Sequence, residues 1–258
     1  MKEVLKVSLF DTFDPDSEEI VSRELPKWFT QPENFPETVI MTFKDGTFQA
    51  LNDLCPTEVV ATLREGRDVP IYRLNWNGRS IGIFQTLIGG AGTAGLLEEA
   101  LVLGAKKVLI YGSCGVLDSA LAAGRLILPT QAYRDEGTSY HYMPVSDYVD
   151  VPTAERLGEI FGELRLPYVK GRVWTTDAFY RETRSNMEKR KADGCIAVDM
   201  ECASAMAVAR FRGVPVYQFL YAEDSLDGGD WDPRTMGKIP MSDHEKYLHI
   251  ALEAASRL

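Results

Sequence analysis

The chain has 258 residues, of which 45% are hydrophobic, and a formal net charge of −10. This content suffices for a sizeable core, and an acidic chain without a lysine or arginine cluster is not expected to have nucleic acid or an anionic membrane as its main partner. No apolar run approaches the roughly 20 residues of a membrane-spanning helix, and the N-terminus lacks a signal-peptide core, so we expect a cytoplasmic protein. The four cysteines form no CxxC pair, which indicates reduced thiols and neither a metal site nor a disulfide framework.

The first part of the chain, residues 1–35, is polar and contains several prolines. This composition predicts an irregular N-terminal extension with one short helix around Ser17–Arg23. Nothing in the sequence is typical of a linker between independently folded halves. We therefore expect one domain over residues 1–258, with the extension as part of it.

The pattern becomes regular after the extension. Asn77-Gly78 is a strong two-residue hairpin turn. A glycine loop at Gly89–Gly95 leads into a helix at Leu96–Leu103, which Gly104 ends. Strands are predicted at these positions: Val39–Thr42, Ile71–Trp76, Ser80–Leu87, Val108–Tyr111, near Leu126, Val169–Trp174 and Val216–Tyr221. Further helices are predicted from Pro152, after Asp199 and from Ser242. Strands that alternate with helices predict an α/β fold with a sheet covered on both faces.

Two glycine patterns look like catalytic or cofactor motifs but fit them poorly. Gly90, Gly92 and Gly95 satisfy GxGxxG, yet the next strand ends in Tyr111-Gly112 and not near an acidic residue that could grip a ribose, which disfavours a dinucleotide site. Two alternatives remain, a tight turn without a ligand and a set of helix-start amides that face a small anion. The run Gly112-Ser113-Cys114-Gly115 lacks the first glycine of GxSxG, so a nucleophile elbow is disfavoured.

Five polar or aromatic residues gather between Trp174 and Asp224. Phe179 and Tyr180 form an aromatic pair, Asp199 and Glu201 flank a methionine, and Asp224 follows a predicted strand. Each has an ordinary explanation: Asp199 as a helix cap, the two rings as core aromatics, and Asp224 as a turn residue. Together they also form a set suited to holding a nucleoside and protonating its leaving base.

Five motifs follow one another in a fixed order along the chain. They are Gly89-Gly90 with Thr93, Gly112-Ser113-Cys114-Gly115, Asp135 to His141, Thr176 to Tyr180, and Val198 to Glu201 with Ala203. In this order they resemble the nucleoside phosphorylase family, which contains hexameric purine nucleoside phosphorylases, uridine phosphorylases and related nucleosidases. The resemblance is clear from Ile71 to the C-terminus and fainter before it. It implies a central mixed β-sheet flanked by helices on both faces, and cleavage of a nucleoside by phosphorolysis with phosphate as co-substrate and no cofactor.

The resemblance also implies roles for individual residues. Phe179 corresponds to the residue on which the base stacks, Met200 to the one under the ribose, and Glu201 to the carboxylate that accepts both ribose hydroxyls. The substrate-binding set that follows from the family is Phe179, Tyr180, Met200, Glu201, Cys114, Gly115 and Asp199. The phosphate-binding set is Ser113, Arg67 and Gly46.

Asp224 matches the catalytic acid of the purine-cleaving members. It must hold a proton near neutral pH, which requires burial or a like charge nearby. Glu223 is its neighbour, but adjacent residues of a strand point to opposite faces, so only one should enter the pocket. Uridine phosphorylases lack this aspartate and carry a glutamine and an arginine for uracil where this chain has Arg181-Glu182-Thr183-Arg184. A purine-like base is therefore favoured.

The phosphate site departs from the family pattern. Ile110 occupies the position of a family arginine, and the best counterpart of the N-terminal Gly-Asp-Pro loop, Lys44-Asp45-Gly46, has no arginine after it. Arg67 matches an arginine that the family supplies from a neighbouring subunit, so we expect a homo-oligomer, either a dimer or a hexamer built as a trimer of dimers. Because few positive partners remain for phosphate, three alternatives stay open: a nucleosidase that uses water, a uridine phosphorylase-like enzyme, and a non-catalytic nucleoside-binding protein.

Overall fold

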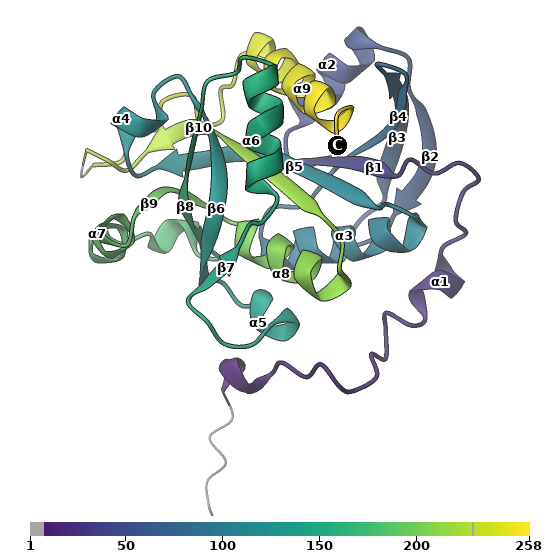
Figure 1. Ribbon diagram of the computed structural model, residues 1–258, viewed down its shortest axis with the longest axis horizontal. Helices are drawn as coiled ribbons and strands as arrows, with labels where there is room; N and C mark the ends of the chain where they lie inside the picture. Colours follow the sequence, from purple (N-terminus) through teal and green to yellow (C-terminus); the bar gives the residue numbers. More distant parts are fainter. Residues whose placement is uncertain (1–7, 229) are drawn as a thin grey trace, which may run out of the picture.

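The computed structural model describes residues 8–228 and 230–258 (Figure 1). Its strands join one sheet in the order β10-β6-β8-β9-β5-β1-β4-β3-β2, and β7 pairs with β6. The strands are β1 (Thr38–Thr42), β2 (Glu58–Leu63), β3 (Val69–Trp76), β4 (Arg79–Gln85), β5 (Lys107–Val116), β6 (Leu126–Asp135), β7 (Tyr148–Asp150), β8 (Tyr168–Thr176), β9 (Cys195–Asp199) and β10 (Val216–Ser225). Strand β10 pairs with β5 as well as β6, so one half of the sheet closes on itself.

Helices cover both faces of this sheet, as Figure 1 shows. One hydrophobic cluster packs α3 and α8 against the sheet, and a second packs α2, α6 and α9 against the opposite face. The expected α/β fold with a central mixed sheet is thereby confirmed. The helices are α1 (Leu25–Trp28), α2 (Asp45–Leu54), α3 (Gly90–Leu103), α4 (Ser119–Ala122), α5 (Ser139–Tyr142), α6 (Ala154–Glu163), α7 (Arg184–Ala192), α8 (Cys202–Arg212) and α9 (Met241–Ala255), with 3-10 turns η1 (Leu9–Asp11) and η2 (Phe179–Arg181).

The predicted hairpin is confirmed. Strand β3 ends at Trp76, β4 begins at Arg79, and the two strands pair antiparallel. Asn77 and Gly78 have φ angles of 50° and 74°. Positive φ at both central residues is what a type I′ turn requires, and its twist matches that of the flanking strands.

Two boundaries near the glycine motifs differ from expectation. Helix α3 begins at Gly90 and not at Leu96, so the glycine loop is mostly helix. Packing explains why glycine is used there, because a Cβ on Gly90 would lie 2.1 Å from Ser204 Oγ. Strand β5 continues past Tyr111 to Val116, because its last residues pair with both β10 and β9.

The N-terminal extension also differs from the prediction. No helix forms at Ser17–Arg23, where the chain makes bends and turns, and the short helix α1 lies just after it. Residues 1–7 of the predicted extension lie outside the described residues. The extension runs along the helical layer of α3 and α8 (Figure 1), where Glu19 forms an ion pair with Arg212 at 2.8 Å.

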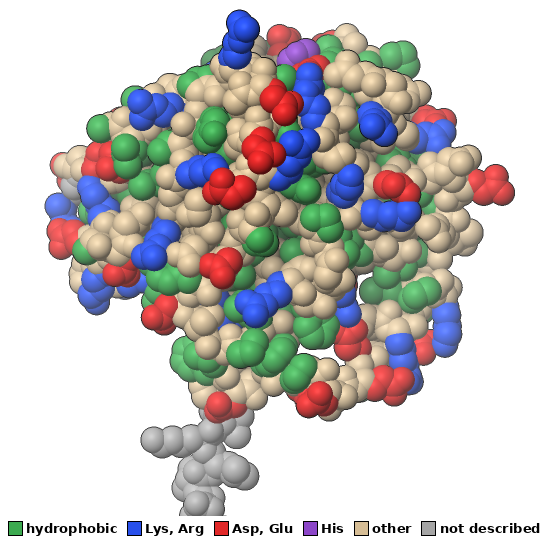
Figure 2. Space-filling model, viewed as in Figure 1, with side chains coloured by type: hydrophobic (Ala, Val, Ile, Leu, Met, Phe, Trp, Pro, Cys, Tyr) green, Lys and Arg blue, Asp and Glu red, His purple; other side chains and the backbone are tan. Residues whose placement is uncertain are grey.

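Charged side chains of both signs are interspersed over the face shown in Figure 2. Within the part of the chain that the structure describes, no helix has the length and apolar content needed to cross a membrane.

Candidate active site

The ends of four strands bring the separate motifs together at one edge of the sheet. Asp224 on β10 lies opposite Gly115 on β5, and Gly115 also lies opposite Val198 on β9. Thr175 on β8 lies opposite Asp199 at the end of β9. The glycine-serine-cysteine motif, the acidic pair and the candidate acid are therefore neighbours although more than a hundred positions separate the first from the last.

Asp199 organises this edge through its own hydrogen bonds. Its side chain accepts from Thr175 Oγ1 at 2.6 Å, from the Cys202 amide at 2.8 Å and from Gln218 Nε2 at 3.3 Å. The carboxylate thus joins β8 and β10 to the first turn of α8, as a helix cap would. Burial raises the pKa of Asp199, although these hydrogen bonds oppose the rise. These contacts support the structural role of Asp199 as a helix cap.

Glu201 lies at the start of α8 and is only 7% exposed. One of its oxygens accepts a hydrogen bond from the Gly89 amide at 2.7 Å, which ties the carboxylate to the turn before α3. Burial and the nearby Asp199 charge raise its pKa. Met200, just before it, is half-buried. A ribose bound here would meet a carboxylate whose position is fixed by backbone.

Asp224 is buried and partnered by an aromatic residue that the sequence motifs did not indicate. Trp231 Nε1 donates to Asp224 Oδ2 at 2.7 Å, while the indole itself is 56% exposed. On the other side, a Cβ placed on Gly115 would lie 3.4 Å from Asp224 Oδ1, so a larger residue there would crowd the carboxyl group. Burial raises the pKa of Asp224, and the hydrogen bond from Trp231 opposes this rise. A raised pKa is what a general acid needs.

Glu223 and Asp224 have different surroundings, and the pairing of β10 with β5 shifts register between Ala222 and Asp224, so regular strand alternation does not by itself explain the difference. Glu223 is 3% exposed, accepts from the Gly237 amide at 3.1 Å and forms an ion pair with Lys44 at 3.1 Å. Its charge is therefore compensated on the Lys44 side, away from the Trp231 contact.

The aromatic pair sits in η2, directly after β8. The Phe179 and Tyr180 rings meet edge to face with centroids 5.0 Å apart. Phe179 is half-buried, whereas Tyr180 is 94% exposed and faces solvent in the single chain. Glu182, two residues further on, adds another carboxyl group within the run Arg181-Glu182-Thr183-Arg184. Burial and the charge of Asp224 raise its pKa to about 8.

Cys114 lies at the same edge in surroundings that disfavour its thiolate. The side chain is 5% exposed, and its Sγ lies 3.5 Å from the Tyr221 carbonyl oxygen. Burial, reinforced by the Asp199 and Asp224 charges, raises the pKa of this thiol well above its ordinary range. Because the thiolate is the reactive form, this environment disfavours nucleophilic chemistry at Cys114.

The expected phosphate residues do not form one cluster within the chain. Ser113 is half-buried on β5, whereas Arg67 is exposed in the turn between β2 and β3, where it donates to Gln85 Oε1 at 3.2 Å. Gly46 lies in the first turn of α2, and a Cβ there would be 2.5 Å from the His244 ring. Ile110, at the family arginine position, is fully buried in the core.

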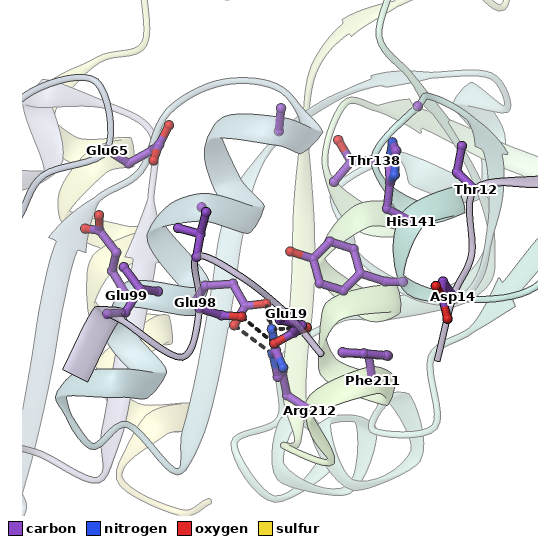
Figure 3. A pocket seen from close by; sticks show the side chains of 17 residues that line it. Thr12, Asp14, Glu19, Glu65, Glu98, Glu99, Thr138, His141, Phe211 and Arg212 are labelled. Atoms are coloured by element: carbon purple, nitrogen blue, oxygen red, sulfur yellow. Dashed lines mark hydrogen bonds and ion pairs between the residues drawn. The ribbon is translucent and has the colours of Figure 1, made fainter. Parts of the chain in front are cut away.

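A separate cavity of about 720 Å³ lies between the N-terminal extension and helices α3, α5 and α8 (Figure 3). Arg212 pairs there with Glu19 and Glu98 at 2.8 Å each. The residues that line it are different from those at the strand ends described above. The candidate active site is therefore the strand edge and not this cavity.

Comparison with known proteins decides the family. The model of the phosphorylase superfamily matches residues 37–258. The chain belongs to the phosphorylase superfamily. This confirms the family and the enzyme class, a nucleoside phosphorylase-like pentosyltransferase, that the five motifs indicate.

Individual relatives carry different substrate names. A guanosine phosphorylase of Halorubrum lacusprofundi is 28% identical over 235 residues, which cover 86% of this chain and 94% of the relative. A purine nucleoside phosphorylase of Toxoplasma gondii, crystallised with immucillin-H, shares the fold with a TM-score of 0.72 and 23% identity, over 87% of this chain and 92% of that one. A uridine phosphorylase of Vibrio fischeri does so with a TM-score of 0.71 and 24% identity, over 88% and 94%. The choice of base therefore has to be argued from the residues of the pocket.

Proposed function

We propose that this protein cleaves the N-glycosidic bond of a purine-like nucleoside by phosphorolysis, giving the free base and a pentose 1-phosphate. The observation that supports it best is the pair of buried carboxyl groups, Asp224 and Glu201, held at one edge of the sheet by Trp231 and the Gly89 amide. Phe179, in the 3-10 turn that follows β8, offers an aromatic face to a base.

The chemistry gives each carboxyl group a task. When the bond between the anomeric carbon and the base nitrogen breaks, its electrons go to the base and positive charge develops on the sugar. Asp224 donates a proton to the base, a contribution of about 10²–10⁴-fold. A phosphate oxygen bonds to the anomeric carbon, and the proton that phosphate releases restores Asp224. Glu201 accepts hydrogen bonds from the ribose hydroxyls and fixes the sugar for attack.

Phosphate binding in this proposal involves a second copy of the chain. Ser113 lies at the strand edge, while the exposed Arg67 would reach the site of a neighbouring subunit in a homo-oligomer. The proposal requires no cofactor other than phosphate as co-substrate.

Hydrolysis is the second candidate, and a specific observation favours it. The position of the family arginine is taken by the core residue Ile110, and Lys44 is already paired with the buried Glu223. An anion with two charges needs positive partners in a buried site. Water has no such requirement and would give the free pentose.

Chromatographic release of free base tests the proposal. Inosine, guanosine, adenosine, uridine and methylthioadenosine are each incubated with the protein, with and without phosphate. Release that requires phosphate supports phosphorolysis, and equal release without it supports hydrolysis. Asp224→Asn should lower purine release at least about 100-fold, whereas Asp53→Asn, which changes an exposed carboxylate on α2, should not. Absence of release from every substrate would contradict both candidates.

A further inference from the structure

The motif from Asp135 to His141 has no task in the proposed mechanism, yet it contains a buried carboxylate. Glu136 is 6% exposed and follows β6, where the chain turns towards α5. Burial withdraws this carboxylate from water, so it needs donors within the protein. Those donors show which parts of the site Glu136 connects.

Hydrogen bonds from two helices meet at the oxygens of Glu136. The Ser204 hydroxyl donates to Oε2 at 2.5 Å, and the Ser139 amide donates to the same oxygen at 2.9 Å. The Ser139 hydroxyl donates to Oε1 and accepts from Arg134 Nε at 2.7 Å. All four side chains are buried. A buried cation is thereby joined to the carboxylate through one hydroxyl group, and this chain of hydrogen bonds ends on α8.

The contact on α8 is close to the carboxylate proposed to bind ribose. Ser204 lies in the first turn of α8, three positions after Glu201. The Ala205 amide donates to the Glu201 carbonyl oxygen at 2.9 Å and closes this turn. One hydrogen-bonded turn therefore connects the two residues, and fixing Ser204 restricts Glu201 as well.

Glu136 also lies against the start of α3. A Cβ placed on Gly90 would be 3.5 Å from Glu136 Oε2, and the preceding residue, Gly89, provides the amide that holds Glu201. Helices α3, α5 and α8 pack together on one side of the sheet (Figure 1). Glu136 thus borders both supports of Glu201, its helix and its amide donor.

Building on the proposed function, we propose that Glu136 is a positioning residue for ribose recognition, which holds the first turn of α8 beside the start of α3 and so fixes the Glu201 carboxylate. Glu136 itself touches no substrate in this arrangement. Its effect passes through the Ser204 hydroxyl and appears wherever substrate binding uses Glu201. A carboxylate suits this place because one of its oxygens accepts from Ser139 and Ser204 at once.

Two substrates that differ at one ribose hydroxyl test this role. For Glu136→Ala, kcat/KM should fall about 100-fold for inosine and less than about tenfold for 2′-deoxyinosine, because a misplaced Glu201 loses a contact that only inosine offers. Ser204→Ala should shift the ratio of the two values in the same direction by about three- to tenfold, and it decides the matter if Glu136→Ala does not fold. Glu136→Gln keeps an oxygen for Ser139 and Ser204 and should restore the ratio to within about threefold of wild type.

Controls separate positioning from a general loss of stability. A smaller folded fraction lowers the activity towards both sugars equally and leaves their ratio unchanged. Thr153→Val removes a hydroxyl that donates to the Val216 carbonyl oxygen at 2.5 Å before α6, and it should not change the ratio. In the Glu201→Gln background, Ser204→Ala should change the ratio no further. A further change there, or a ratio that Ser204→Ala alone leaves unchanged, would overturn the role of Glu136.

Calorimetry separates this inference from the proposed reaction. In the Asp224→Asn background, which keeps the nucleosides intact, inosine should bind more tightly than 2′-deoxyinosine, and Ser204→Ala should reduce this preference. If the preference falls but the wild type cleaves no nucleoside, the positioning role stands and the reaction fails. If nucleosides are cleaved and the preference is the same without the Ser204 hydroxyl, the reaction stands and the role of Glu136 fails. Equal binding of both sugars before Ser204 is changed would also overturn that role, since no ribose contact would exist for Glu136 to position.

Discussion

The hydrogen bond from Trp231 should control the proton affinity of Asp224. The indole nitrogen lies 2.7 Å from a carboxylate oxygen that belongs to a buried residue. A hydrogen bond to a charged group contributes about 1.5–3 kcal/mol, and one pH unit in pKa corresponds to about 1.4 kcal/mol. Trp231→Phe keeps an aromatic ring but removes the donor that favours the ionised form. The pKa of Asp224 should therefore rise by about one to two pH units.

The pH profile of kcat/KM reports this change. Asp224 must be protonated to act as the acid, so activity should fall as pH rises through its pKa, and this alkaline limb should move up by about one to two pH units in Trp231→Phe. Trp76→Phe is the matched control, because Trp76 Nε1 donates to Glu253 Oε1 at 2.8 Å at another place on the chain. A limb that stays in place in Trp231→Phe, or moves to lower pH, would refute the reasoning.

The free energy of unfolding should also depend on pH through the raised pKa of Asp224. Burial places the folded-state pKa of Asp224 above its unfolded value near about 4, so the folded state binds the extra proton between these two values. The stabilising contribution is fully present below the unfolded pKa and is lost as pH rises through the folded pKa. In Trp231→Phe this loss should extend to higher pH, which urea unfolding measured across pH 4 to 9 would reveal.

Three further variants test other parts of the site. Glu201→Gln should lower kcat/KM about 100-fold for ribonucleosides and less for 2′-deoxynucleosides, because a carboxylate that accepts both hydroxyls is replaced; an equal loss for both sugars in steady-state assays would argue against that contact. Gly90→Ala should destabilise the fold by about 1–3 kcal/mol in urea unfolding, because its Cβ would lie 2.1 Å from Ser204 Oγ, and Ser204→Ala should restore part of the loss. Gly162→Ala in α6, with nothing within 4 Å of the new Cβ, is its control and should not destabilise. Glu223→Gln should lower the KM for phosphate several-fold by releasing Lys44 from its ion pair, and an unchanged KM would exclude Lys44 from phosphate binding.

Local sequence signals predicted the elements that local chemistry determines. The Asn77-Gly78 turn is an example, because two residues with positive φ set both the hairpin and its register. The predicted start of α3 at Leu96 was wrong, because the helix begins at Gly90. Glycine disfavours helix in isolation, and only the packing against Ser204 explains its use there. Helix α2 was missed for a related reason. It begins with Asp45-Gly46, which is typical of a turn, and it has no side-chain cap.

In the candidate site, too, some features could be predicted from the sequence and others depend on tertiary packing. Motif order indicated that Asp199, Glu201 and Asp224 would be neighbours, and the pairing of β5 with β9 and β10 brings them to one edge. Trp231 gave no such signal. Trp231 lies in a loop rich in glycine and aspartate, and its contact with Asp224 depends on how that loop returns to the strand at the Ser225–Asp232 bridge. Contacts of this kind are set by tertiary structure and have no sequence period.

The two halves of the proposed site differ in how completely one chain builds them. The nucleoside half is fixed by contacts within the chain, since Glu201 is held by the Gly89 amide and Asp224 by Trp231. The acceptor half has no comparable anchor, since Ile110 is a core residue and Lys44 is neutralised by Glu223. A buried phosphate dianion needs positive partners, and in the proposed acceptor site Arg67 of a neighbouring copy provides one. Base recognition should survive in an isolated chain even where phosphorolysis does not.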